Sequence, residues 1–251
     1  MKKFIMMVIA TLLMLPSYMM ADSYSMLWKQ YERAQQKDLP KTSMNVLKKI
    51  ITKAKADKRY GHLLKAELLH GSLASQVSPD SLTVEVERLV ASMHKAERQD
   101  PVLAAVYQSS LGRLYRENVR LSDNSKELSE EYYRKSLSHP DLLAAHKASE
   151  YVPMVIEGID SRIFGNDLLH VLGMEAEAYG MLHDYYQKQN NRPAACITAL
   201  LRVRQDRDGD VMQVRKSKYL LTIDSLIDHY KDLSVAGELA IERYRFMEQA
   251  V

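Results

Sequence analysis

Glycine and proline are scarce in this chain of 251 residues, which has only 9 Gly and 7 Pro. A collagen-like chain needs Gly at every third position, and long low-complexity segments are usually rich in both residues. Both classes are therefore excluded. With 46% hydrophobic residues, the chain can bury a core in one elongated domain or in two smaller ones.

Cysteine is almost absent, because Cys196 is the only one. A single thiol cannot form an internal disulfide, so the fold must depend on packing even in an oxidising compartment.

Long apolar runs are also missing. The longest run, Phe4–Leu15, has about 12 residues, whereas a membrane span needs about 20. It follows Lys2 and Lys3 and leads to a small residue, Ala21, as in a secretory signal peptide. We therefore expect a signal peptide over residues 1–21, cleaved after Ala21, and an exported protein of the periplasm, the outer-membrane surface or the outside of the cell. The cleavage region has no Cys for lipid attachment, and no membrane span is expected.

An excess of charge of one sign is lacking as well. The chain has 35 Lys and Arg against 32 Asp and Glu, and loss of the two leader lysines leaves a net charge of +1. Clusters such as Lys48-Lys49 are typical of the solvated face of a helix, so we expect no nucleic-acid partner.

Strand signals are nearly absent, and helix signals recur. Asp208-Gly209 is the one dipeptide typical of a hairpin turn, whereas Met44, Leu47, Ile51 and Ala54 repeat at helical spacing. The fold class is predicted to be all-α.

Caps and breaks mark several expected helix boundaries. Ser78-Pro79 and Asp100-Pro101 each combine an N-cap residue with proline at the first helical position. Asn124 with Glu127 resembles a capping box, and His139-Pro140 should end one helix and begin a short one.

Residues 151–166 interrupt this pattern, because Tyr151-Val152-Pro153 and Glu157-Gly158 favour extended backbone and a turn. We expect an extended joint there, between an N-terminal helical region over residues 22–150 and a second helical-repeat region over residues 167–251.

An internal repeat is visible in the second region. Tyr186 and Tyr230 are 44 residues apart, and each is followed by a short turn and a helix that begins with small residues. This pattern is typical of tetratricopeptide-like α-solenoids, although their period is about 34 residues. We therefore expect an irregular helical-hairpin array.

Several stretches resemble the N-terminal region of the large alpha-2-macroglobulin-like proteins exported by Bacteroidota. They are Trp28-Lys29-Gln30-Tyr31, Asp38-Leu39-Pro40-Lys41-Thr42, His139-Pro140-Asp141-Leu142-Leu143, Tyr151-Val152-Pro153-Met154, Asp160-Ser161-Arg162-Ile163-Phe164 and Asn166-Asp167-Leu168-Leu169-His170-Val171. The resemblance covers most of residues 22–251. It implies a helical region that precedes β-sandwich domains in a protease-trapping protein.

The trapping parts of that family are not in this chain. Its thioester needs a Cys with a Gln three residues later, and here Cys196 is followed at that distance by Ala199. No catalytic, cofactor-binding or metal-binding residue can therefore be carried over. We expect a non-enzymatic scaffold or interaction region that contacts a protein partner or further domains of the same polypeptide. The alternative is a stand-alone periplasmic helical-repeat protein that binds a peptide or an envelope partner.

Patterns of known enzymes are incomplete. Ser92-Met93-His94-Lys95 has the spacing of serine acyl-enzymes and Ser122-Asp123-Asn124 is similar to their second motif, but Lys41-Thr42-Ser43 lacks the required Gly. Without a sheet to carry an oxyanion hole, we expect a helix surface and a capping turn instead.

Metal sites are not expected either. Asp206-Arg207-Asp208-Gly209-Asp210 is similar to a calcium loop, but Arg204 and Arg215 stand where that loop requires carboxylates. His62 and His70 are eight residues apart with no third ligand near them in sequence. Cys196 is expected to be a small buried hydrophobic residue.

Tyrosine is abundant, with 15 residues against 3 Phe and one Trp. A tyrosine can fill a core with its hydroxyl near water or contact a partner. We expect mainly structural roles for six of them: Tyr107, Tyr115, Tyr132, Tyr133, Tyr185 and Tyr186.

The last helix has an apolar stripe formed by Ala240, Tyr244, Met247 and Val251. An exposed stripe at the end of a solenoid promotes association. We therefore expect the helical array to continue beyond residue 251, or the chain to self-associate.

Overall fold

The computed structural model describes residues 23–77, 81–119, 121–155, 158–206 and 218–248. These residues form helices with no strand, and Lys147 and Asp167 form one isolated antiparallel bridge. The all-α prediction is confirmed. No helix in these ranges is both long and apolar enough to cross a membrane. The expected signal peptide, the Ser78-Pro79 cap and most of the Asp206–Asp210 loop lie outside the described residues.

The chain divides into two compact units, at Ala96/Glu97. The first contains a helix over residues 23–36, α2 (Pro40–Asp57), α3 (Tyr60–Val77) and most of α4 (Ser81–Gln99), together with Glu150–Val155. The second contains the rest of the chain. This boundary differs from the expected one at residues 151–166, because the helices after Asp100 pack with the later helices.

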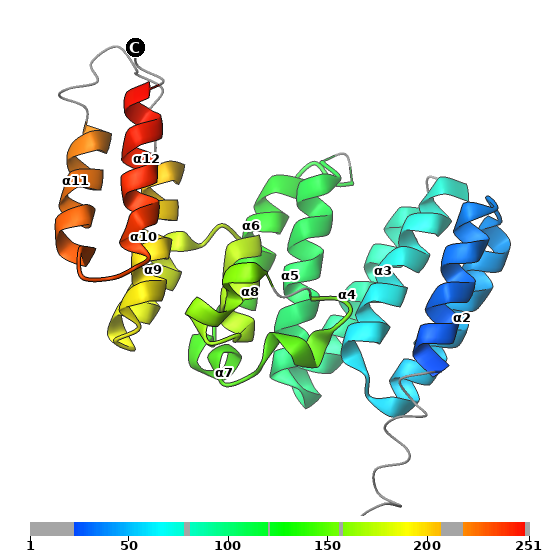
Figure 1. Ribbon diagram of the computed structural model, residues 1–251. Helices are drawn as coiled ribbons and strands as arrows, with labels where there is room; N and C mark the ends of the chain where they lie inside the picture. Colours follow the sequence, from blue (N-terminus) through cyan, green and yellow to red (C-terminus); the bar gives the residue numbers. More distant parts are fainter. Residues whose placement is uncertain (1–22, 78–80, 120, 156–157, 207–217, 249–251) are drawn as a thin grey trace, which may run out of the picture. The chain divides into compact units, whose positions relative to one another are not determined.

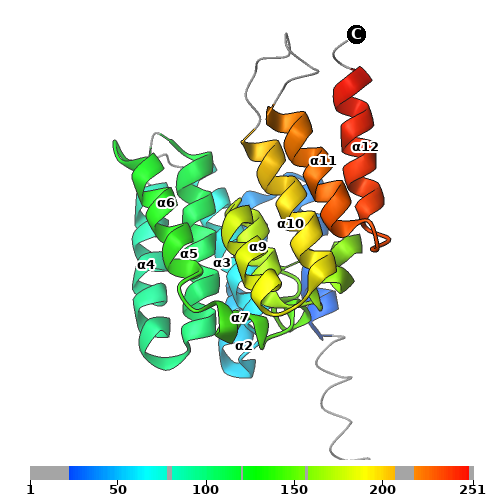
Figure 2. The same cartoon turned by 90° about the vertical axis from the view of Figure 1, so that its left-hand side faces the viewer.

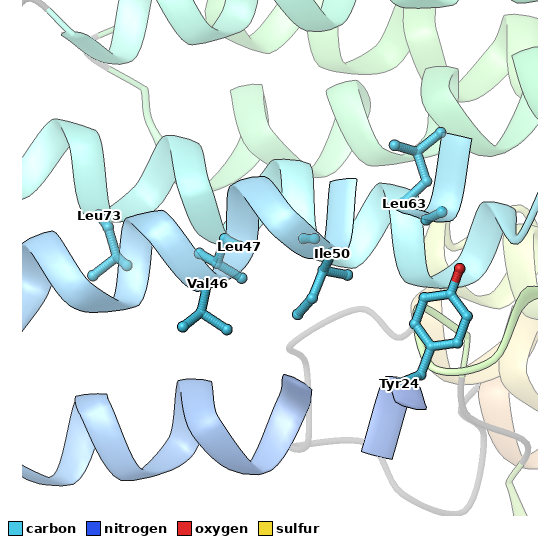
Figure 3. Packing of buried hydrophobic residues seen from close by; sticks show 8 residues of the cluster. Tyr24, Val46, Leu47, Ile50, Leu63 and Leu73 are labelled. Carbon is cyan, nitrogen blue, oxygen red and sulfur yellow. The ribbon is translucent and has the colours of Figure 1, made fainter. Parts of the chain in front are cut away.

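The core of the first unit lies between residues 23–36, α2 and α3. Its central side chains include Leu47 and Ile50, which are fully buried, and Figure 3 shows them beside Val46, Leu63, Leu73 and Tyr24. The stripe expected over Met44–Ala54 is thus one side of a broader face that also buries Val46 and Ile50.

Gly61 explains why the segment Glu150–Val155 belongs to the first unit. A Cβ atom on Gly61 would lie 2.2 Å from the carbonyl oxygen of Tyr151 and 2.4 Å from that of Val152. Only glycine permits so close an approach of one backbone to another.

The second unit begins with α5 (Pro101–Glu117), α6 (Ser125–Ser136) and α7 (Pro140–Ala144). Asp100 caps α5, because its carboxylate accepts a hydrogen bond from the N–H of Leu103 at 3.0 Å. Helix α5 is buried on nearly every side over residues 102–112. At Gly112 a Cβ would lie only 2.9 Å from the ring of Tyr133, so the small residue lets α6 pack closely.

The capping box expected at Asn124 does not form. Asn124 makes no side-chain capping bond, and the hydroxyl of Ser125 instead donates to the carbonyl of Ser122 at 2.8 Å. The break at His139-Pro140 is confirmed, because α6 ends at Ser136 and α7 begins at Pro140.

Two short 3-10 helices follow, η1 (Ala148–Tyr151) and η2 (Ile159–Phe164). The described part of the expected extended joint is therefore mostly tight helical turns. Gly165, at a φ of +71°, ends η2 in a left-handed conformation that favours glycine.

The last elements of the second unit are α8 (Leu168–Glu175), α9 (Tyr179–Lys188), α10 (Arg192–Gln205), α11 (Lys218–Tyr230) and α12 (Ala236–Glu248). Helices α9 and α10 pack together, and so do α11 and α12 (Figures 1 and 2). Tyr186 and Tyr230 are both buried, near the end of the first helix in each pair. A shared core of Cys196, Leu200, Ile223, Tyr230, Ala236 and Leu239 joins the two pairs.

Candidate functional site

The second unit contains a cleft of about 880 Å³ between η2, α8, α10 and the beginning of α12. Figure 1 labels three of these helices, α8, α10 and α12. Its volume is near the upper end of the 300–1,000 Å³ that is usual for ligand sites. The cleft is lined by Gly158, Asp160, Ser161, Ile163, Phe164, His170, Val171, Met174, Glu175, Ile197, Leu200, Leu201, Arg204, Ser234, Val235, Gly237, Glu238 and Ile241.

One wall of the cleft depends on how α8 begins. Asp167 is its N-cap, and the carboxylate accepts a hydrogen bond from the N–H of His170 at 2.8 Å. On the other side of η2, the amide of Asn191 donates to the carbonyl of Ile163 at 2.9 Å. Asn191 is also the N-cap of α10, so this hydrogen bond connects η2 to α10.

A buried polar cluster lies behind this wall. His170 Nε2 is 3.3 Å from Ser161 Oγ, and His170 Nδ1 is 3.3 Å from Asp167 Oδ1. The hydroxyl of Tyr186 donates to the same carboxylate at 3.0 and 2.9 Å, and Phe164 stacks on the imidazole. Burial, and then the charge of Asp167, raise the pKa of Tyr186 well above its usual range, so its hydroxyl stays a donor.

The contacts from Asp167 to His170 and from His170 to Ser161 are similar to those of a nucleophilic triad. The surroundings of these residues, however, indicate a structural role. Ser161 is only 3% exposed. Its own N–H donates to the carbonyl of Gly158, and the N–H groups of Gly165 and Asn166 donate to carbonyls within the same turn. These groups therefore cannot stabilise an oxyanion. The cluster joins η2, α8 and α9 and positions the wall of the cleft.

The floor and walls of the cleft carry aliphatic side chains that remain partly accessible. Ile241 is 44% exposed, and Leu201 is half-buried. The other half-buried apolar residues of the cleft are Ile163, Val171, Met174, Ile197 and Val235.

Two of the charged groups of the cleft are neutralised by neighbours. Arg204 on α10 pairs with Glu242 through Nε at 2.8 Å and Nη2 at 2.6 Å. Glu242 is 7% exposed and also accepts a hydrogen bond from Tyr219 at 2.5 Å. Glu175 pairs with Arg116 at 2.6 Å.

Two other carboxylates of the cleft have no such neighbour. Asp160 lies on η2 and Glu238 on the first turn of α12, and both are exposed. Neither forms an ion pair with any residue that the structure describes. The cleft therefore combines an apolar floor with a net negative charge.

The residues of the enzyme-like patterns lie on separate elements of the structure. Ser92 lies within α4, Ser122 in the turn before α6, and Lys41 in the first turn of α2. Ser122 is engaged locally, because its hydroxyl accepts a hydrogen bond from the N–H of Asn124.

The two histidines weighed as metal ligands have separate environments. Trp28 donates from its indole N–H to His62 Nδ1 at 2.9 Å, whereas His70 Nδ1 lies 3.5 Å from Glu85. No group of three or more His, Cys, Asp or Glu side chains in the described ranges is placed to hold a metal ion. Cys196 is fully buried, as expected, and burial raises the pKa of its thiol to about 11.

Of the six tyrosines considered, Tyr107, Tyr133 and Tyr186 are buried. Tyr115, Tyr132 and Tyr185 are half-buried, and the rings of Tyr115 and Tyr132 stack at 5.8 Å. None of the six lines the cleft.

The sequence patterns do not predict the cleft or its polar cluster. The N-cap signal of Asp167 before Leu168 was available in the sequence. The contacts of Asp167 with Tyr186, 19 residues away, were not, because they depend on how α9 packs. Comparison with models of protein families, with curated proteins and with solved structures finds no match for this chain.

Proposed function

We propose that this protein is a non-enzymatic helical interaction module, and that the cleft between η2, α8, α10 and α12 binds a segment of a protein partner. The observation that carries the proposal is the accessible aliphatic lining of the cleft. Removing side chains such as Ile241 and Leu201 from water stabilises a complex by roughly 25 cal/mol per Å² of apolar surface buried. A contiguous apolar hollow with a polar rim is typical of interaction sites.

The resemblance to the exported alpha-2-macroglobulin-like proteins supports a role for this module as one region of a larger protein. Two of the resembling stretches, Asp160–Phe164 and Asn166–Val171, form η2 and the beginning of α8 and so build one wall of the cleft. We propose that the chain is the helical N-terminal region of such a protein, which protects the cell against proteases. In that case the bound segment belongs to a further domain of the same polypeptide or to another protein.

The helical-hairpin array is part of this proposal. The pairs α9–α10 and α11–α12 each join two helices by a short connection, and they share a core around Cys196 and Tyr230. Stacking of such pairs leaves one row of helices able to line a groove. Helices α8, α10 and α12 contribute to the cleft in this way.

Peptide display with the mature protein tests the cleft directly. Selected peptides should lose binding to a Leu201→Gln, Ile241→Gln variant and keep binding to Leu221→Gln. Leu221 is a matched control, because it is 62% exposed on α11 and does not line the cleft. Failure to enrich any peptide, or equal binding by the cleft variant, would contradict the proposal.

The alternative is a stand-alone helical-repeat protein of the periplasm that uses the same cleft. Sequencing the DNA beyond the Val251 codon separates the two. An uninterrupted frame that encodes β-sandwich domains supports the macroglobulin-like assignment, whereas a stop codon favours the stand-alone protein.

The proposed export has a separate test. N-terminal sequencing of the protein from its native cell envelope should begin at Asp22. A protein that keeps Met1 would contradict export.

A further inference from the structure

We infer that the segment bound in the cleft is an amphipathic helix with an aliphatic face bordered by Lys or Arg. This inference rests on the proposed binding function and adds the chemical class of the partner. It follows from the charges of the cleft and from the hydrogen-bonding state of its walls.

The charges on each element facing the cleft determine the sign of the partner. On α8, the carboxylate of Glu175 is neutralised by Arg116, which also donates to the carbonyl of Glu175 at 2.9 Å. On α10, Arg204 is neutralised by Glu242. Among the charged residues that line the cleft, Asp160 on η2 and Glu238 on α12 are left, and neither forms an ion pair with a residue in the described ranges.

Complementary charge favours a basic partner over an acidic one. A Lys or Arg brought to Asp160 or Glu238 gains an ion pair near the surface, while an Asp or Glu there meets a like charge. Pairs of this kind change affinity by up to about fivefold each, and the effect weakens as salt screens the charges.

The walls exclude one mode of recognition, the addition of a β-strand. An added β-strand needs an exposed sheet edge with free backbone N–H and C=O groups. The cleft is built from helices, whose interior backbone groups are already bonded, and the described ranges contain no strand. Recognition must therefore occur mainly through side chains, as when an amphipathic helix lies in a groove with aliphatic residues at i, i+3, i+4 and i+7.

Fluorescence anisotropy with the whole mature chain tests this inference. The probes are an amphipathic helical peptide of Leu, Ala and Lys, the same peptide with Glu in place of Lys, and a peptide of the basic composition with its order scrambled. The ordered basic peptide should bind at least tenfold more tightly than either of the others at 50 mM salt, and this preference should shrink at 300 mM salt.

Variants of Asp160 and Glu238 test whether these two carboxylates cause the preference for the basic peptide. Asp160→Asn with Glu238→Gln should weaken binding of the basic peptide by about three- to tenfold at 50 mM salt and reduce its salt dependence. Asp184→Asn with Glu130→Gln is the matched control, because both residues are exposed in the same unit and neither lines the cleft. The control should leave the affinity unchanged.

The outcomes separate this inference from the proposed function. Peptides that bind and depend on Leu201 and Ile241, but show no preference for Lys over Glu, would overturn the inference and leave the binding function in place. Equal loss in the cleft and control charge variants would also overturn it. Peptides that bind through neither the apolar floor nor the carboxylates would overturn both.

Discussion

The hydroxyl of Tyr186 donates to both carboxylate oxygens of Asp167, at 3.0 and 2.9 Å, in the buried interior of the second unit. Through this contact α9 holds the N-cap of α8, and with it the wall of the cleft. A carboxylate that is only 6% exposed needs such donors, because burial of an ionised group without partners costs several kcal/mol.

Tyr186→Phe should therefore destabilise the protein by about 1–3 kcal/mol, because it removes a donor from a buried carboxylate. Urea unfolding followed by circular dichroism measures this change. Tyr230→Phe is the matched control. Tyr230 occupies the corresponding place in the repeat and is 2% exposed, but its hydroxyl has no hydrogen bond to a described residue. Equal effects of the two changes would contradict a special role for Asp167.

Gly61→Ala should destabilise the first unit by about 1–3 kcal/mol, although alanine has the higher helix propensity. The added Cβ would meet the carbonyl oxygen of Tyr151 at 2.2 Å, and a backbone atom cannot rotate away. Trp28, the only Trp, lies in this unit and reports its unfolding by fluorescence. Gly237→Ala on α12 is the control, because a Cβ there meets nothing within 4 Å, and it should be neutral or stabilising.

Acid should weaken the first unit through His62. Burial, and then the charges of Arg59 and Lys65, lower the pKa of His62 from 6.5 to about 4. The ring stacks on Tyr24 at 4.1 Å, and its Nδ1 accepts a hydrogen bond from the indole N–H of Trp28, so the folded state favours the neutral form. The unfolded chain binds a proton more readily, so this contribution to stability is complete above pH 6.5 and is lost as the pH falls towards 4.

Comparison of wild type with His62→Gln isolates this group. Urea unfolding followed by Trp28 fluorescence at pH 7 and at pH 4.5 should show a loss of stability on acidification that is about 1–2 kcal/mol smaller in the variant. An identical loss in both proteins would show that other groups account for the pH dependence.

Cys196 should be inert in the folded protein. Its thiol is fully buried, and its pKa is raised to about 11 by burial, so little thiolate is present at pH 8. A colorimetric thiol reagent should react slowly with the native protein and rapidly in urea. Fast reaction of the native chain would place Cys196 at an accessible site.

Ser161 should not behave as an activated nucleophile. A fluorophosphonate probe should leave the native protein unlabelled, because the serine is buried and the neighbouring N–H groups are already bonded. Mass spectrometry of the treated protein measures this. A stoichiometric adduct that disappears in Ser161→Ala would refute the non-enzymatic assignment.

Helix content and several helix ends were determined by the sequence alone. The Asp100-Pro101 start of α5 and the break at His139-Pro140 depend on residues adjacent in the chain, so local signals were sufficient. Tyr186 and Tyr230, which the sequence pattern aligned, are both buried, and each lies near the end of the first helix of a packed pair.

Only the tertiary structure decided which faces were buried and where the cleft lies. Helix α5 shows a single apolar stripe in sequence, yet Gln108 and Ser109 are buried as well, in a helix that packs against both α6 and α8. The capping box at Asn124 does not form, and the turn before α6 is held by hydrogen bonds between Ser125 and Ser122. The wall of the cleft depends on contacts across 9, 19 and 28 residues, which join Ser161 to His170, Asp167 to Tyr186 and Ile163 to Asn191. Such contacts follow from the packing of whole helices, and local sequence patterns carry no information about them.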